Sequence, residues 1–155
     1  MIYRPYNSAD FPALYAIEEI CFQPPFRFPQ RYMRRLVESP GTITWIGEEN
    51  SQIAGFAIAD CEWEPSGLVA YLQTIEVLPA MRSHGAGSEL LRRIEDSARG
   101  LGAESIWLHV DSHNAGAIRL YESHGYACEG RNDRYYPHGR AALIYRKRLE
   151  SADPA

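Results

Sequence analysis

The feature that most constrains the fold is a change of hydrophobic period at Pro79. Residues 68–78 form a largely apolar run with β-branched and aromatic side chains, which predicts a strand. Pro79 is followed by a polar turn with two glycines, and apolar residues then recur at helical spacing, at Leu90, Leu91, Ile94, Ala98 and Leu101. A strand that passes into a helix through such a turn indicates a sheet covered by helices, so we expect an α/β fold.

The remaining segments predict further strands at 2–6, 42–46, 52–60, 105–110, 126–130 and 141–149, and helices that begin near Asp10 and cover 29–38 and 115–123. In the first helix, Asp10 is expected to cap the N-terminus. Its apolar stripe is expected to consist of Leu14, Ile17, Ile20 and Cys21. The 155 residues, 45% of them hydrophobic, suit one domain, expected to span 1–150, with a disordered tail at 151–155.

The composition argues against several classes of partner. The formal net charge of -4 gives no general attraction for nucleic acid or for an anionic membrane. No apolar run approaches the roughly 18 residues of a membrane span, and the N-terminal residues lack the pattern of a signal peptide. Cys21, Cys61 and Cys128 are widely separated, which favours free thiols in a reducing compartment. We therefore expect a cytoplasmic protein that binds neither nucleic acid nor membrane.

The turn before the long helix has the chemistry of a phosphate-binding site. It reads RSHGAG over 82–87, where two glycines allow close backbone approach and Arg82 adds a positive charge. The following helix offers free N–H groups and the positive end of its dipole. An ordinary glycine-containing turn is the open alternative. A dinucleotide-binding fold is disfavoured, because Leu90 stands where its third glycine is required.

Two longer motifs resemble signatures of the GCN5-related N-acetyltransferase (GNAT) family. Residues 77–87, VLPAMRSHGAG, are similar to the family's Gln/Arg-x-x-Gly-x-Gly/Ala loop. Residues 114–126, NAGAIRLYESHGY, are similar to a second segment, a short helix that carries an Asn and a Tyr. The resemblance implies a single GNAT-type α/β domain, in which helices flank a mixed and mostly antiparallel central sheet with splayed central strands.

The resemblance also implies acetyl-CoA as the acyl donor, with no metal. The backbone of Ile75, Glu76 and Val77 would pair with its pantetheine arm between the splayed strands. Asn114 and Tyr121 would lie beside it. The pyrophosphate would be cradled by the loop, through Arg82, Ser83, His84, Gly85, Ala86, Gly87 and Ser88.

Other segments resemble the peptide Nα-acetyltransferases, including those of the ribosomal-protein-alanine type. Residues 108–114, LHVDSHN, are similar to the segment that precedes their Asn, and residues 134–140 resemble their Tyr-Tyr loop. Two departures concern the acceptor. Ala141-Ala142 replaces an acidic pair, and His109 stands where the bacterial members often carry Glu.

Three residues would carry the chemistry by the same resemblance. His109 would be the base, Tyr71 would hold an ordered water that relays the proton, and Tyr121 would protonate the leaving thiolate. A His has a reference pKa of about 6.5, which suits an α-amine with a pKa of about 7.7–8.0. Ordinary packing in the sheet and in the helix is the alternative for each, and a backbone-held water is an alternative base.

The acceptor is expected to be the α-amine of a peptide or protein N-terminus, held between Phe26 and the Tyr135-Tyr136 loop. A small amine, such as a polyamine or an aminoglycoside, or a lysine side chain, stays open as acceptor, and an acidic cleft would favour a polyamine. A coenzyme-A-binding regulator would need neither Tyr121 nor His109. A homodimer also stays open. No spacing supports a zinc site at His109, His113 and His124, nor a nucleophilic role for Cys128.

Overall fold

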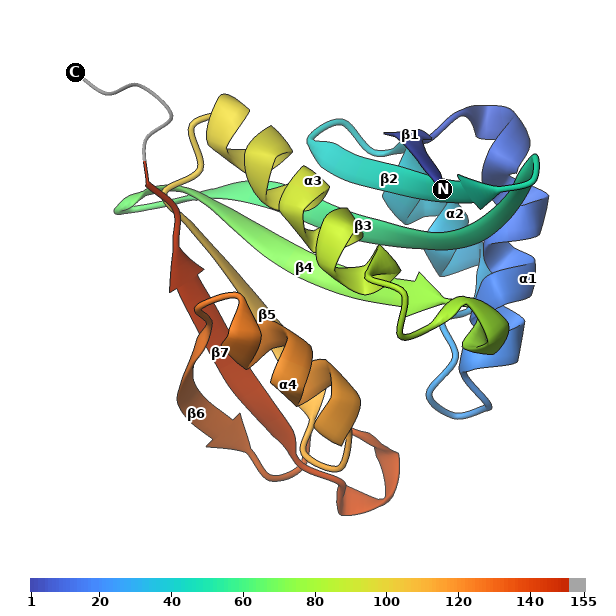
Figure 1. The fold of residues 1–155 in the computed structure, drawn as a ribbon. Coiled ribbons are helices and arrows are strands. Elements are labelled where there is room, and N and C mark those ends of the chain that lie inside the picture. Colours follow the sequence, from blue (N-terminus) through green and yellow to red (C-terminus); the bar gives the residue numbers. More distant parts are fainter. Residues whose placement is uncertain (151–155) are drawn as a thin grey trace.

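A computed structural model describes residues 1–150 of the protein. One seven-stranded sheet forms its centre, and helices lie on both faces (Figure 1). The strands are β1 (Ile2–Pro5), β2 (Thr42–Glu49), β3 (Gln52–Glu64), β4 (Gly67–Val77), β5 (Ser105–Asp111), β6 (Ala127–Asn132) and β7 (Ala142–Arg148). The helices are α1 (Phe11–Cys21), α2 (Gln30–Glu38), α3 (Ala86–Gly100) and α4 (Ala115–Ser123). The expected tail at 151–155 lies outside the described residues.

The strand order in the sheet is β1-β2-β3-β4-β5-β7-β6. Neighbouring strands pair antiparallel except β4 and β5, which are parallel and are joined by α3. A parallel pair needs a long crossover connection, and a helix supplies it. The expected mixed, mostly antiparallel sheet flanked by helices is therefore confirmed.

The sheet opens between β4 and β5. Within the described chain, their ladder covers three residue pairs, from Val69 opposite Ser105 to Tyr71 opposite Trp107. Beyond Tyr71, β4 runs on to Val77 while β5 turns away (Figure 1). The register of β3 with β4 also shifts here, so that Gln73 stands as an extra residue in β4. The expected splay of the central strands is thus confirmed.

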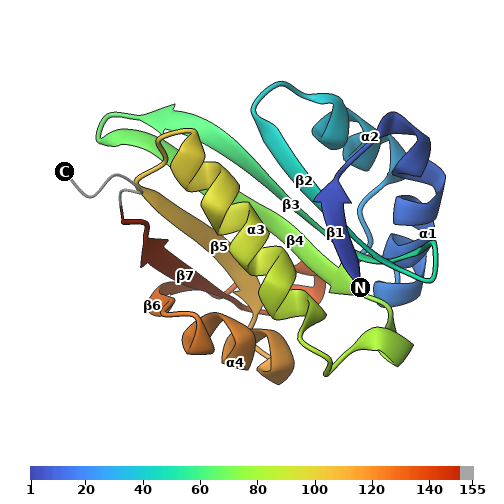
Figure 2. The ribbon, with the colours of Figure 1, turned by 45° about the horizontal axis from the view of Figure 1, so that its top comes forward.

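Two apolar layers cover the faces of the sheet. On one face α3 buries Leu90, Leu91 and Ile94 against strand residues that include Ala57 and Ala59. On the other face α1 and α2 pack on β2 and β3, through Phe11, Leu14, Ile17, Met33, Ile46, Phe56 and Ile58. Since side chains alternate along a strand, β3 turns alanines towards α3 and large residues towards α1. Figure 2 shows α3 lying across the sheet and α1 and α2 beyond β2.

Asp10 is the N-cap residue of α1, as expected, but two details of the expected helix differ. Ile20 is 55% exposed, because the buried stripe follows the spacing of Leu14, Ile17 and Glu18, which Ile20 does not share. Asp10 precedes the helix but its side chain makes no capping hydrogen bond to α1. It belongs instead to a capping box with Asn7, which begins a short 3-10 turn before α1.

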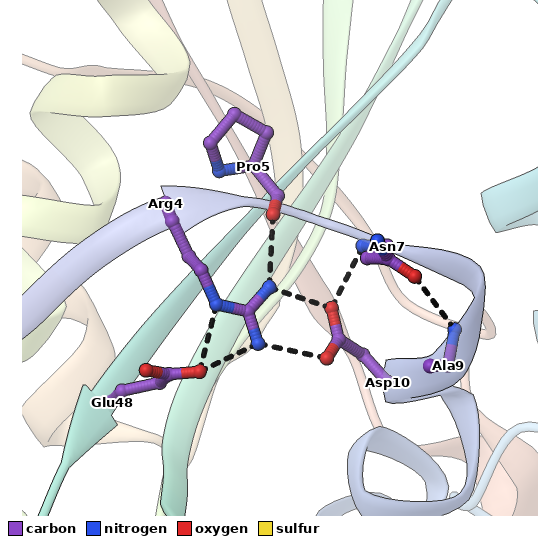
Figure 3. Close-up of polar contacts among 6 residues, drawn as sticks. All are labelled: Arg4, Pro5, Asn7, Ala9, Asp10 and Glu48. Carbon is purple, nitrogen blue, oxygen red and sulfur yellow. Dashed lines mark hydrogen bonds and ion pairs between the residues drawn. The ribbon is translucent and has the colours of Figure 1, made fainter. Parts of the chain in front are cut away.

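Asp10 also binds Arg4 (Figure 3). The Arg4 Nη1 and Nη2 atoms each lie 2.8 Å from an Asp10 carboxylate oxygen, and Nε donates to Glu48 over 2.7 Å. The guanidinium holds the pKa of Asp10 below its usual value. This network ties β1 and β2 to the start of α1.

The hairpin of β3 and β4 is longer than expected. β3 continues past residue 60 to Glu64, where Trp63 pairs with Leu68 in register. The sequence does not predict this extension, because charged residues flank Trp63, which is 81% exposed. No helix within residues 1–150 is long and apolar enough to cross a membrane.

Candidate active site

A cavity of about 1100 Å³ opens where β4 and β5 diverge. Its floor is formed by residues of β3, β4 and β5, and one wall is the segment 22–29 between α1 and α2. The start of α4 and the segment 135–140 before β7 close the other side. The same irregularity that opens the sheet therefore creates the site.

Three rings from adjacent strands line the floor. Tyr71 on β4 is opposite Trp107 on β5 in register, with ring centroids 4.6 Å apart. His109, two residues further along β5, lies on the same face, 5.3 Å from Trp107. The expected alternation on β5 is confirmed, since Ile106, Leu108 and Val110 are buried on the other face.

Tyr71 and His109 form a direct polar pair. The Tyr71 hydroxyl and His109 Nδ1 are 2.8 Å apart, so one of them donates to the other. Burial lowers the pKa of His109, which favours the neutral imidazole. Burial, followed by the nearby Tyr135 hydroxyl, raises the pKa of Tyr71 and keeps the phenol protonated. The pair is therefore neutral at physiological pH.

The predicted acceptor residues meet over this pair. Tyr135 stacks on His109, and Tyr136 contacts Tyr135 edge-on with centroids 4.9 Å apart. Phe26, from the segment 22–29 on the opposite side of the cavity, lies 5.8 Å from Tyr136. Burial, followed by Tyr135, raises the pKa of Tyr136 to about 12. Phe26, Tyr135 and Tyr136 thus form one aromatic wall, although Phe26 is more than 100 residues from the two tyrosines in sequence.

Arg140 joins the two walls, which the sequence did not indicate. Its guanidinium lies 5.1 Å from the ring centroid of Phe26, and Nη1 lies 3.0 Å from an Asp111 carboxylate oxygen. Because Asp111 ends β5, this contact connects the floor to the loop that carries Tyr135 and Tyr136. It is a partly exposed contact, so it orients the loop more than it stabilises the fold.

Tyr121 on α4 reaches the cavity from the other side of the opening. It is 7% exposed, and burial raises its pKa, so its hydroxyl keeps its proton. Asn114 also lines the cavity, and its Oδ1 accepts the Ala117 N–H over 3.1 Å as the cap of α4. Asn114 therefore positions the helix that carries Tyr121.

The segment 82–88 lies beyond the end of β4, at the start of α3. Ser83 and Gly85 have positive φ, 68° and 86°, which turns the chain into the helix. A Cβ on Gly85 would meet nothing within 4 Å, so the space beside the first turn of α3 is open. The Ser88 hydroxyl lies 3.0 Å from His124 Nε2 at the end of α4. The open space beside Gly85 leaves room for a ligand at the start of α3, where the N-terminal N–H groups of a helix favour an anion.

Arg82 lies elsewhere than the loop motif suggests. Its Nε donates to the Val77 carbonyl over 2.8 Å, and its Nη2 lies 3.5 Å from the Cys21 sulfur. The guanidinium therefore faces the end of β4 and α1. A place beside a pyrophosphate stays a prediction for this residue.

Two buried acids went unnoticed in the sequence. Glu18 on α1 is fully buried and Glu76 on β4 is 2% exposed, although only the Glu76 backbone was assigned a role. A signal was present for Glu18, since it stands four residues after Leu14 and three before Cys21 on the apolar stripe.

The mouth of the cavity is acidic. Asp60, Glu62 and Glu64 alternate along β3 and line the same side of it. Gln73 donates to Asp60 over 2.8 Å. Residues 1–150 contain no group of three or more His, Cys, Asp or Glu side chains arranged to hold a metal ion.

Comparisons with known proteins place these features in a family. Residues 11–126 match the model of the acetyltransferase (GNAT) family. The [ribosomal protein bS18]-alanine N-acetyltransferase of Escherichia coli K12 is 31% identical over 134 residues, which are 84% of each chain. Streptothricin acetyltransferase of Streptomyces lavendulae is 35% identical over 96 residues, 61% of this chain and 49% of that protein.

A solved structure agrees with the sequence relationship. The crystal structure of the ribosomal-protein-S18-alanine N-acetyltransferase from Escherichia coli superposes with a TM-score of 0.85 at 28% identity. The match covers 99% of this chain and 96% of that one. The similarity therefore extends over both halves of the opened sheet.

Proposed function

The chain belongs to the acetyltransferase (GNAT) family, and on that premise we propose that its acceptor is the α-amine of a peptide or protein N-terminus. Membership makes it an acetyl-CoA-dependent N-acetyltransferase. The observation that carries the choice of acceptor is the neutral Tyr71–His109 pair under the Tyr135-Tyr136 wall.

The basicity of the amine supports an α-amine. With a pKa of about 7.7–8.0, roughly a tenth of an α-amine is already neutral at pH 7, whereas a lysine amine near 10.4 is under about 0.1% neutral. A neutral histidine of lowered pKa is a weak base. Such a base suffices for the α-amine and is poorly matched to lysine.

The residues present fit acetyl-CoA, which supplies an activated acetyl thioester. Beyond Tyr71, β4 pairs with β3 but not with β5, so its β5 side offers backbone groups at Ile75, Glu76 and Val77 to an extended arm between the strands. The open first turn of α3, with Ser83 to Ser88, suits a pyrophosphate. Asn114 and Tyr121 line the same opening.

The side chains divide the proton transfers between two sides of the opening. In the tautomer whose Nδ1 carries no proton, Tyr71 donates its hydroxyl proton to His109 Nδ1 and keeps oxygen lone pairs free for the amine, or for a water between them. A proton lost by the amine to the Tyr71 oxygen thus ends on His109 as the Tyr71 proton passes to Nδ1. Burial keeps the Tyr121 hydroxyl protonated, so that it can donate its proton to the sulfur as the sulfur leaves. A backbone N–H near Val77 would hold the acetyl oxygen as its negative charge grows.

The aromatic wall suits a peptide backbone. Phe26, Tyr135 and Tyr136 offer large apolar rings, and the two tyrosines add hydroxyls that can hydrogen-bond main-chain groups. Recognition of this kind reads little sequence beyond the first residue. The relative from Escherichia coli, named for acetylation of an alanine of a ribosomal protein, is consistent with this choice.

A small polyamine is the second candidate. Asp60, Glu62 and Glu64 at the mouth would attract a second positive charge, and a streptothricin acetyltransferase is among the relatives. An aminoglycoside or a lysine side chain would use the same cavity. A cytoplasmic location, a homodimer, and the exclusion of nucleic acid and membrane stay predictions.

The test compares matched acceptors in an assay of coenzyme A release. A peptide with a free N-terminus should be acetylated, and the same peptide with a blocked N-terminus and a free lysine should be a poor substrate. Spermidine and an aminoglycoside serve as small-amine acceptors. Equal reaction of the blocked peptide, or reaction of the small amines alone, would overturn the α-amine proposal.

A further inference from the structure

The buried acids Glu18 and Glu76 connect the segment 22–29, which carries Phe26, to β4. The Phe28 N–H donates to Glu18 Oε2 over 2.9 Å, and the Thr74 hydroxyl donates to Glu76 Oε2 over 2.9 Å. The second oxygen of each acid, Oε1, is buried and has no donor among the described residues. Glu76 stands opposite Phe56 in register, on the face of the sheet that α1 covers, and the Cys21 thiol of α1 lies 3.7 Å from the Val77 carbonyl, so both carboxyl groups lie between α1 and the end of β4.

Two ionised carboxylates cannot satisfy these oxygens, since each could only accept. Leaving two charges and two unpaired oxygens buried would be strongly unfavourable. A single proton between the acids removes one charge and satisfies both orphan oxygens with one O–H···O bond. Carboxyl pairs in contact share a proton for the same reason.

We propose that Glu18 and Glu76 share one proton and act as a positioning pair that holds the segment 22–29 against β4. Glu18 lines the cavity from α1, but neither acid is assigned a contact with the reacting atoms. It acts through Phe28, whose N–H it accepts, and so through the wall on which Phe26 stands. As a role in acceptor binding it rests on the function proposed above.

Phe28 is held on both of its main-chain polar groups. Glu18 accepts its N–H, and the Tyr15 hydroxyl donates to its carbonyl over 2.7 Å. Both partners come from α1, and Arg27 makes a further contact with α1 through Nη2, which donates to the Glu19 carbonyl over 3.0 Å. Loss of the Glu18 contact would therefore free the wall where it meets the cavity.

Other groups around the pair set the direction of its titration. Cys21 faces it from α1, its thiol pKa raised by burial, and Arg82 contacts Cys21 from beyond β4. Phe56, opposite Glu76 in register on β3, is apolar. Burial, followed by the contact with Glu18, raises the pKa of Glu76 well above its usual value. The shared proton is therefore lost at a pH well above the usual range for glutamate, and its loss leaves two adjacent negative charges.

The first experiment is independent of any acceptor. Carboxyl-carbon NMR of the full chain should show one glutamate of the pair titrating far above 4.5, the usual value for Glu. In Glu18→Gln the high titration should fall, because the partner charge is gone. The exposed neighbour serves as control, and Glu19→Gln should leave the titration unchanged. Two normal titrations would overturn the shared proton.

The second experiment measures how firmly the segment 22–29 is held. Hydrogen exchange over 22–29, corrected for the intrinsic pH dependence, should accelerate about tenfold in Glu76→Ala, the scale of one lost hydrogen bond to a buried acid. In Glu76→Gln it should stay slow, because the amide donates as the protonated acid does. The wild type should accelerate as the pair loses its proton at high pH, whereas Glu76→Gln should not. Equal behaviour of wild type and Glu76→Gln at every pH would overturn the positioning role.

Kinetics then tests the link to the acceptor. The KM for the accepted amine should rise at high pH in the wild type and stay flat in Glu76→Gln, while kcat follows the same pH dependence in both. If the peptide is no substrate but NMR and exchange behave as stated, the α-amine proposal fails and the positioning pair stands. If hydrogen exchange over 22–29 changes with pH while the KM does not, the link between the pair and acceptor binding is overturned.

Discussion

Tyr135 lies flat on His109, with ring centroids 4.1 Å apart and an angle of 7° between the planes. The stack covers an imidazole whose pKa burial lowers. Tyr135→Ala should expose the ring and let its pKa rise towards 6.5. Since His109 must be neutral to accept a proton, the acid limb of kcat/KM should move to higher pH and the rate near pH 6 should fall.

The matched control is Tyr135→Phe, which keeps the stacked ring and should leave the limb in place. A pH–rate profile of both variants decides the matter. An unchanged limb in Tyr135→Ala would mean that the stack does not govern the titration of His109.

Tyr121→Phe should lower kcat about 10²-fold and leave acetyl-CoA affinity nearly unchanged. The buried phenol is protonated in the resting protein, so the variant loses a proton donor but little packing volume. Tyr126→Phe is the comparison, because it is a buried tyrosine that bonds Glu95 instead of lining the cavity. Normal turnover by Tyr121→Phe would leave that residue with packing alone.

Gly87→Val should weaken acetyl-CoA binding at least about tenfold, or about 1.4 kcal/mol. A Cβ at this position would stand in van der Waals contact with the Leu120 side chain, 3.5 Å away, and the two methyl groups of valine would add bulk where the first turn of α3 is proposed to approach the pyrophosphate. Gly100→Ala, at the far end of α3 with nothing within 4 Å, is the control and should bind normally. Calorimetry on folded variants gives the answer, and equal affinities would remove the loop from the cofactor site.

The Arg4–Asp10 pair predicts an acid-sensitive contribution to stability. The pKa of Asp10 is lowered in the folded state, so the contribution is present above the unfolded pKa of about 3.8 and is lost as pH falls through the folded value. Asp10→Asn should cost about 1–2 kcal/mol at pH 7 and much less at acid pH. Denaturant unfolding at both pH values checks this. Asp96→Asn, in an exposed pair with Arg99, should change stability by less than about 0.5 kcal/mol.

Glu76→Gln should make the protein more stable at neutral and alkaline pH. Because the pKa of Glu76 is raised in the folded state, wild-type stability falls as pH rises from the unfolded value near 4.5 towards the folded one. An amide has no charge to bury and removes that fall. Between pH 5 and pH 9, the midpoint temperature of thermal unfolding should fall in the wild type relative to Glu76→Gln. A constant difference between the two proteins would contradict the burial of a proton on this pair.

The positions of the main elements followed from local patterns, and the contacts of the site did not. Alternation on β5 was enough to place His109 with Trp107, and helical spacing was enough to bury Leu90 and Ile94. The partner of His109 could be named only by resemblance, since Tyr71 lies 38 residues away on another strand. Local spacing carries no information about such a pairing.

Two side-chain contacts that the sequence does not predict have the same origin. Asp10 has the chemistry of a helix cap, yet Arg4 lies close enough to occupy its carboxylate, which no window around Asp10 reveals. Arg82 stands in a phosphate loop, but its guanidinium reaches the Val77 carbonyl and Cys21. Long side chains choose partners in three dimensions, so their roles are the least predictable from sequence.

The three residue pairs that join β4 to β5 also divide the molecule mechanically. On one side stand β1 to β4 with α1 to α3, and on the other β5, β7 and β6 with α4 (Figure 1). This ladder is the shortest in the described sheet, so bending about it disturbs the fewest paired residues. Acetyl-CoA bound in the opening would contact both parts of the molecule and stiffen the β4–β5 junction. Departure of the product would make that junction flexible again.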